Sequence, residues 1–184
     1  GGTQAVHDLL VRVAGADIAN QFKLELSSAS LCDDSVSHST TSSSPVNNGE
    51  REGEGDRDCF QLFDASSANG EHAVQVVGST TSALATGVGV YLKRFCNASL
   101  TWVKTGAMQL GVLNNNNGTL PQVGHSQSDP VCAQRTARFT HYMNVVDNSY
   151  NFVWWNLDRW VQEIDWMALH GVNLALAYTG QEEV

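Results

Sequence analysis

The sequence lacks any apolar stretch long enough to cross a bilayer, and it begins at Gly1 without a basic and apolar leader. It is also poor in basic residues: 10 Lys and Arg stand against 19 Asp and Glu, giving a formal net charge of −9. Nucleic-acid binders need clustered cations to displace counterions from phosphates, so this balance argues against that class. We expect no membrane span and no nucleic-acid partner, and we expect any targeting segment to lie outside this sequence.

Several catalytic motifs are missing as well. The sequence contains no Cys-x-x-Cys pair, no P-loop, no G-x-G-x-x-G and no G-x-S-x-G. These absences remove zinc-ribbon, thioredoxin-type, nucleotide-binding and nucleophile-elbow interpretations. Four dispersed cysteines fit four buried thiols as well as any of three disulfide connectivities, and they are Cys32, Cys59, Cys96 and Cys132.

Two glycosylation sequons are present, at Asn97 and Asn117. Such triplets also arise by chance at about this frequency in a chain rich in Asn, Ser and Thr. They permit a secretory route without establishing one.

The first part of the chain predicts a helix followed by a strand. Apolar side chains recur at i, i+3, i+4 and i+7 over 3–14, with Thr3 as a candidate N-cap and Gly15 as a stop. Residues 21–27 alternate apolar and charged side chains, which is typical of a half-buried strand. The apolar positions of the two elements are Val6, Leu9, Leu10 and Val13, then Phe22, Leu24 and Leu26.

A polar segment and two strands follow. Residues 33–58 carry no apolar periodicity, so we expect a surface insertion there. Strands are expected at 59–66 and 71–79, joined by the turn signal Asn69-Gly70.

The next segment predicts a second helix and a last pair of strands. Residues 79–96 carry a helical apolar stripe, in which Gly87 and Gly89 are tolerated best where another backbone packs closely. Strands are expected at 100–104 and 108–113. This element order predicts a small sheet with helices on one face, the α+β architecture.

A polar stretch without periodicity, 114–130, is the best domain boundary. We therefore divide the chain into an N-terminal α+β domain at 1–122, a linker at 123–136 and a second domain that starts at 137.

The second domain reads as strand, helix, strand. A strand is expected at 137–146, a helix between the N-cap Asn156 and the stop Gly171, and a strand at 172–178 that is apolar enough to be buried on both faces and hence parallel. One such unit cannot stand alone, so we expect an incomplete (β/α)₈ barrel whose remainder is missing. The helix should bury Trp160, Val161, Ile164, Met167 and Ala168 and expose Asp158, Arg159, Gln162 and Glu163.

In such barrels the functional groups follow the strands. The first strand end offers residues 144–147 with Tyr150 and Trp154 in the following loop, and the second offers residues 179–182. Aromatic rings that stack on a sugar, beside amides and carboxylates that bind hydroxyls, suit a carbohydrate site.

Each of these residues also has a plain structural interpretation. Glu182 is a structural acid more often than a catalytic one, and Asp147 has only its position in its favour as a second carboxylate. His141 and His170 have no partner pattern. Core packing is the commoner role for Trp154, Trp155, Trp160 and Trp166.

Residues 142–182, "YMNVVDNSYNFVWWNLDRWVQEIDWMALHGVNLALAYTGQE", closely resemble the start of the catalytic barrel in the α-N-acetylglucosaminidases of glycoside hydrolase family 89. The specific parts are Asn144, the run 149–155, the run 163–177 and Gly180-Gln181-Glu182. Residues 79–96 and 100–106 more weakly resemble that family's small N-terminal domain.

The resemblance implies a retaining exo-hydrolase of terminal α-linked N-acetylglucosamine, lysosomal or secreted, with glycans such as heparan sulfate as substrate and no metal or organic cofactor. The two catalytic glutamates of that family lie on later strands, so this stretch alone is expected to be inactive. Asn144 matches the sugar-binding position, Val146 stands where many relatives carry Cys, and Glu182 becomes a structural acid near the site with Gln181 and Tyr150.

A second hypothesis remains open from the sequence: a non-catalytic glycan-binding or interaction domain. An unpaired barrel unit would expose a strand edge and an apolar helix stripe, so a lone domain should be poorly soluble. The sequence leaves the oligomeric state open.

Overall fold

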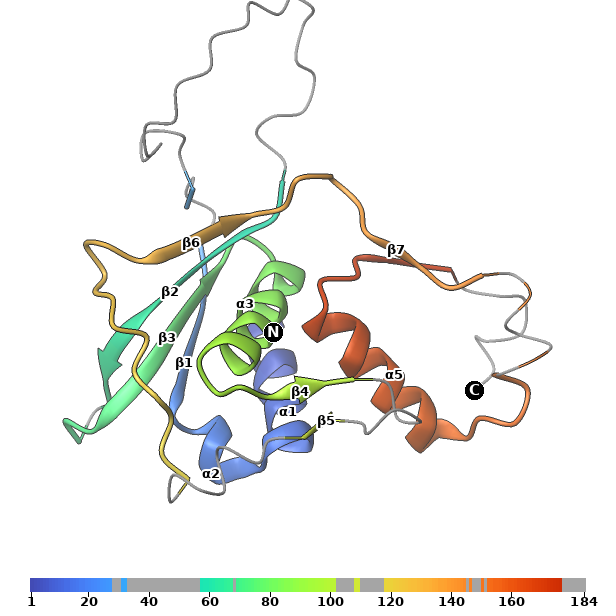
Figure 1. Cartoon of the computed structure of the whole chain (residues 1–184), viewed down its shortest axis with the longest axis horizontal. Coiled ribbons are helices and arrows are strands. Elements are labelled where there is room, and N and C mark those ends of the chain that lie inside the picture. Colours follow the sequence, from blue (N-terminus) through green and yellow to red (C-terminus); the bar gives the residue numbers. More distant parts are fainter. Residues whose placement is uncertain are drawn as a thin grey trace, which may run out of the picture.

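The structure, a computed structural model, describes residues 1–27, 31–32, 57–67, 69–101, 108–109, 118–144, 146, 150 and 152–176. Its core is a four-stranded sheet with helices on one face (Figure 1). A further helix, with one short strand before it and one after it in the sequence, packs beside the helices of that layer. The α+β class predicted for the N-terminal domain is confirmed.

The sheet has the strand order β1-β3-β2-β6. β1 runs parallel to β3, and β2 runs antiparallel to both β3 and β6. The strands are β1 Phe22–Leu26, β2 Cys59–Ser66, β3 His72–Gly78 and β6 Val131–Gln134. The predicted β2–β3 hairpin is confirmed, with Gly70 at φ 80° in its turn.

Residues 123–136 contribute more to this sheet than the predicted linker would. β6 lies inside that range and pairs with β2 along the edge of the sheet. The preceding stretch is held by Asp64, whose two carboxylate oxygens accept the backbone N–H groups of Val123 and Gly124 at 2.8 and 2.7 Å. Leu120 and Val123 are buried in the core.

Two helices precede β1 and one follows β3: α1 Gly2–Ala14, α2 Ala16–Ala19 and α3 Thr81–Arg94. The predicted stop at Gly15 is confirmed, because this residue has φ 89°. The predicted N-cap Thr3 is wrong: α1 begins earlier, and the carbonyl of Gly1 accepts the N–H of Ala5 at 3.2 Å.

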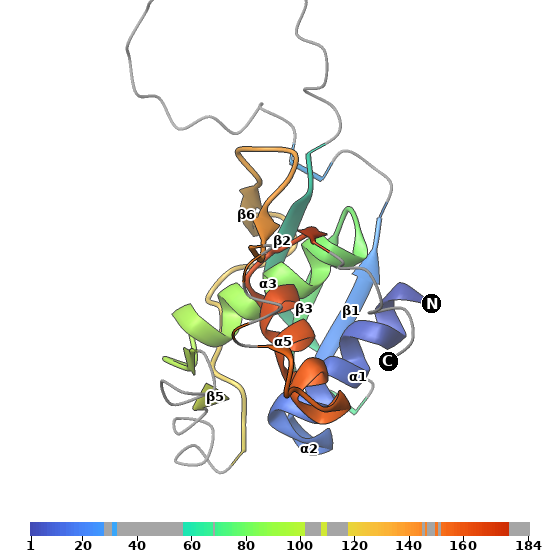
Figure 2. The ribbon, with the colours of Figure 1, turned by 90° about the vertical axis from the view of Figure 1, so that its right-hand side faces the viewer.

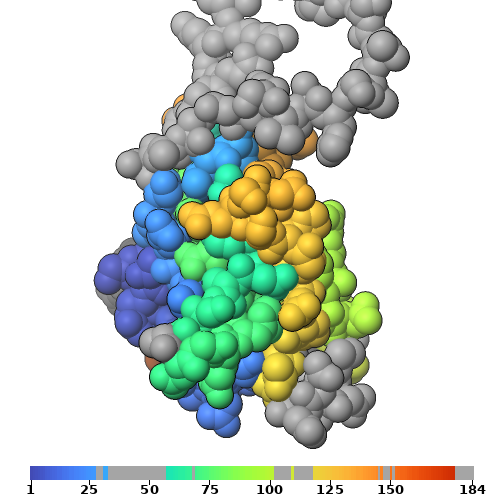
Figure 3. Space-filling model, turned by 90° about the vertical axis from the view of Figure 1, so that its left-hand side faces the viewer, coloured from blue at the N-terminus to red at the C-terminus, as the bar shows by residue number. Residues whose placement is uncertain are grey.

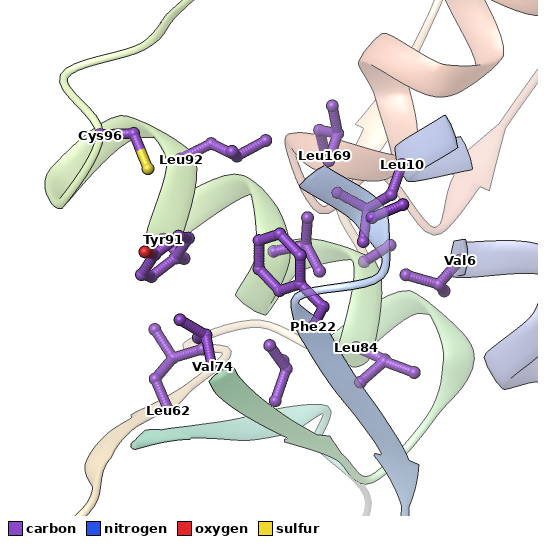
Figure 4. Close-up of a cluster of buried hydrophobic side chains, with 14 of the residues drawn as sticks. Val6, Leu10, Phe22, Leu62, Val74, Leu84, Tyr91, Leu92, Cys96 and Leu169 are labelled. Carbon is purple, nitrogen blue, oxygen red and sulfur yellow. The ribbon is translucent and has the colours of Figure 1, made fainter. Parts of the chain in front are cut away.

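The core lies between the sheet and the helices, as Figure 4 shows for the side chains around Phe22 and Tyr91. The Tyr91 ring meets Phe22 edge-on at 5.4 Å, and its hydroxyl donates to the carbonyl of Pro121 at 2.5 Å. The opposite face of the sheet, seen in Figure 3, has no helix over it among the described residues.

Some predicted elements are described only in part. The expected strands at 100–104 and 108–113 correspond to β4 Ser99–Leu100 and β5 Met108–Gln109, which pair antiparallel. The remaining residues of these two segments, apart from Thr101, lie outside the described residues, as does the predicted insertion except for residues 57–58.

The predicted strand–helix–strand unit is present as β7 His141–Tyr142, α5 Leu157–Leu169 and β8 Leu174–Ala175. β7 and β8 are parallel, as predicted. Both residues of β8 are exposed in this chain, so the burial on both faces expected within a complete barrel stays a prediction. Within the part of the chain that the structure describes, β8 pairs only with β7. Figure 2 shows α5 lying beside α3.

Helix α5 has the predicted N-cap, since the Asn156 side chain accepts the N–H of Arg159 at 3.0 Å. Its buried face differs from the predicted stripe: Ile164 is exposed, whereas Glu163 and Asp165 are buried. The helix packs against α3 on one side and against an aromatic cluster on another. Its two buried carboxylates have partners: Tyr142 and Arg159 donate to Glu163, and Arg12 of α1 donates to Asp165.

Candidate functional site at the carboxyl end of β7

The candidate site begins where β7 ends. Met143 has φ 87° and is buried, so the chain turns sharply before Asn144, which is exposed. The side-chain oxygen of Asn144 accepts the backbone N–H of Val146 at 3.0 Å, which closes a short turn. Asn144 and Val146 thus lie at the strand end where parallel α/β barrels bind their ligands.

Exposed aromatic side chains follow this turn. Tyr150 is 75% exposed and Trp154 is 87% exposed. For Trp154 the core-packing interpretation is therefore wrong. Flat rings held open to solvent beside a polar turn can stack on the C–H face of a sugar.

The other three tryptophans of this region do pack in a core. Trp155 and Trp160 lie against Phe152, with ring centroids 4.3 and 5.2 Å away, and Trp166 lies against Tyr142 at 5.2 Å. This second core is small and also contains Met143 and Met167. It anchors both the turn after β7 and the start of α5.

A buried carboxylate beneath the turn was missed by the sequence analysis. Glu163 is fully buried and accepts hydrogen bonds from the Tyr142 hydroxyl and from Arg159 Nη2, each at 2.8 Å. The Arg159 guanidinium also lies 3.8 Å above the Trp155 ring. Because Tyr142 comes two residues before Asn144, this network orients the strand that presents the site.

The sequence did carry a signal for Glu163. Arg159 precedes it by one helical turn, which is the spacing of an intrahelical ion pair. The apolar stripe alone places both residues on the solvent side of the helix.

The two histidines near the unit have different surroundings. His141 is exposed. His170 stacks on Trp166 at 4.3 Å, its Nδ1 lies 2.8 Å from the carbonyl oxygen of Trp166, and burial lowers its pKa. The prediction of a satisfied structural histidine fits His170.

Gln181, Glu182, Asp147 and Asn117 lie outside the described residues, so their predicted roles stay predictions. Asn97 is described: it is exposed, with φ 47°, directly between α3 and β4, where its side chain is accessible to glycosylation.

The described residues contain no cluster of three or more His, Cys, Asp or Glu arranged to hold a metal ion. The helices in the same ranges are all too short or too polar to cross a membrane.

The fold is similar to part of a solved glycoside hydrolase. A family 89 glycoside hydrolase from Clostridium perfringens, solved with PUGNAc, matches 99% of this chain with a TM-score of 0.69 at 24% identity. The same enzyme solved with 2-acetamido-1,2-dideoxynojirimycin gives a TM-score of 0.70 at 24% identity. At this identity the likeness establishes the fold, and it covers 16% of the bacterial chain.

The sequence comparisons give the family. The α-N-acetylglucosaminidase N-terminal domain matches residues 4–122, and the tim-barrel domain of the same family matches residues 140–184. The human α-N-acetylglucosaminidase is 38% identical over 115 residues, 62% of this chain and 14% of the human protein. The chain belongs to the α-N-acetylglucosaminidase family, which confirms the resemblance noted in its sequence, and it spans about a seventh of that relative's length.

Proposed function

We propose that this chain is the N-terminal part of a retaining exo-glycosidase that releases terminal α-linked N-acetylglucosamine from glycans such as heparan sulfate, in a lysosome or outside the cell. The observation that carries the proposal is the exposed polar and aromatic turn at the end of β7, formed by Asn144, Val146 and Tyr150. A double Glu→Gln variant of the Clostridium perfringens relative was solved with its substrate GlcNAc-α-1,4-galactose. A sugar of this kind fits the amide and ring chemistry of the turn.

Exposed apolar side chains on the β7-α5-β8 unit support the incomplete-barrel part of the proposal. Large hydrophobic residues are open to solvent on both α5 and β8, and Leu174 is 45% exposed. Further βα units of a barrel would cover such a surface, whereas an independent glycan-binding domain would leave it open. The exposed residues are Leu157, Ile164 and Leu174.

The catalytic part of the proposal predicts a difference between this chain and the complete protein. We expect the 184-residue chain to show no turnover of an aryl α-N-acetylglucosaminide and the complete protein to hydrolyse it. Retaining hydrolysis needs two carboxyl groups roughly 5–5.5 Å apart at the sugar, and the buried Glu163 and Asp165 are already paired with arginines. Turnover by the short chain, or none by the complete protein, would contradict the proposal.

A second prediction concerns Asn144 in the complete protein. Asn144→Ala should lower kcat/KM by roughly tenfold or more, because a polar contact to the sugar is lost. Asn144→Asp is the matched control, since its carboxylate can still accept the Val146 N–H but cannot donate to the substrate. Steady-state kinetics should show both variants impaired. If Asn144→Asp were fully active, the role of this residue would be confined to the turn.

A further inference from the structure

Two cysteines share the face of the sheet opposite the helices. Cys59 opens β2 and Cys132 lies in β6, and the strand register pairs Gln61 with Cys132 and Cys59 with Gln134. Residues that pair across strands point to the same face, so the two thiols are diagonal neighbours. Phe60, which alternates with them, packs in the core on the opposite face.

A third cysteine lies against the same two strands. The Sγ of Cys32 is 3.8 Å from the carbonyl oxygen of Phe60 and 3.9 Å from that of Ala133. The neighbouring carbonyl of Leu31 accepts a hydrogen bond from Gln61 Nε2 at 2.6 Å, which fixes this short stretch over β2. Cys32 therefore sits above the β2–β6 pair, between the two thiols of the sheet.

The sulfur atom of Cys32 interacts with those of Cys59 and Cys132. Burial raises the pKa of Cys32, and side-chain hydrogen bonding with Cys59 and Cys132 raises it further, with the Cys59 contribution the larger. Cys96 is different: it is fully buried in the main core, where burial raises its pKa to about 11. It has no place in the cluster of Cys32, Cys59 and Cys132.

We propose that Cys32 and Cys59 form a disulfide that closes the polar stretch 33–58 at its two ends and ties residues 31–32 to the sheet. Cys59 is favoured over Cys132 because it is buried on this face, whereas Cys132 is exposed, and because a bond to Cys59 closes the smaller loop. A polar, aperiodic stretch cannot hold its ends together through a core of its own, so a covalent link at its base compensates.

The bond forms by thiol–disulfide exchange with an oxidised dithiol oxidoreductase or a small-molecule disulfide. Cys32, which is more exposed than Cys59, first forms a mixed disulfide with the oxidant and releases one reduced thiol. Cys59 then attacks the Cys32 sulfur and releases the second. The oxidant takes up two electrons and the two thiol protons, and Cys132 keeps its thiol. This link is independent of sugar hydrolysis.

Peptide mapping tests the connectivity directly. The protein is secreted from a eukaryotic host, alkylated without reduction, deglycosylated and cleaved with trypsin. Each cysteine falls in its own tryptic peptide: 24–51, 58–93, 95–104 and 105–135. We expect peptides 24–51 and 58–93 to be linked and the other two to be alkylated. A 24–51 to 105–135 link, or four alkylated cysteines, would overturn the proposal.

Thermal unfolding with and without a reductant provides the second test. Reduction should lower the Tm of the wild-type protein by about 5–10 °C, because the open chain regains conformational entropy when unfolded. Cys32→Ser should abolish this difference. Cys132→Ser removes a thiol from the same cluster and should preserve it. A reductant effect that persists in Cys32→Ser, or that disappears in Cys132→Ser, would refute the Cys32–Cys59 bond.

Discussion

Gly89→Ala is expected to lower the free energy of unfolding by about 2–4 kcal/mol, although alanine is the better helix former. A methyl group at this position would overlap the carbonyl oxygen of Leu169 and lie 2.8 Å from its carbonyl carbon. The obstacle is the backbone of α5, so α3 and α5 would have to separate. That separation outweighs the gain of about 1 kcal/mol in helix propensity.

Gly87→Ala in the same helix is the matched control. Its methyl group would meet the Val76 side chain at 2.8 Å and the Phe60 ring at 3.1 Å, and side chains can shift where a backbone cannot. Both substitutions give the same gain in helix propensity. Urea denaturation should therefore give a clearly lower free energy of unfolding for Gly89→Ala than for Gly87→Ala. Equal stabilities, or the reverse order, would show that the α3–α5 contact yields more easily than the structure implies.

Gly89 shows which features a local sequence pattern can predict and which it cannot. The sequence indicated a close backbone approach at Gly87 or Gly89, and the structure places one at Gly89, against α5. The β2–β3 hairpin, α3 and the N-cap of α5 could also be predicted, because each depends on residues that are close together in the sequence. The pairing of β6 with β2 and the packing of α5 against α3 could not be predicted, since no local pattern records such distant partners.

Errors arose where a distant partner changed the meaning of a residue. The polar stretch before β6 was interpreted as a linker because nothing in it shows that β2 has a free edge and that Asp64 holds two of its backbone N–H groups. Glu163 was placed in solvent because Tyr142 and Arg159 satisfy it only in three dimensions. The turn after β7 could be located because the apolar pattern of the strand ends there. The buried network that orients this turn could not be predicted.

Asp165 is the clearest case of such a distant partner. It is 3% exposed on α5, and its two carboxylate oxygens accept Arg12 Nε and Nη2 at 2.8 and 2.7 Å. Arg12 lies in α1, so this bidentate pair joins the first helix of the N-terminal domain to the start of the barrel. Fork-like geometry of this kind fixes orientation as well as distance.

Arg12→Ala should therefore destabilise the protein by about 2–4 kcal/mol, mainly because a buried carboxylate loses its partner. Arg12→Lys should recover only part of the loss, since an ammonium group cannot bind both oxygens in the same way. The double variant Arg12→Met/Asp165→Leu removes the uncompensated charge, and we expect it to be more stable than Arg12→Ala. If Arg12→Ala has the lowest denaturant midpoint of the three variants, the loss of stability comes from leaving Asp165 buried without a partner. If the double variant were the least stable of the three, the contribution of the pair would come from its direct attraction, and α1 would depend on that ion pair for its position against α5.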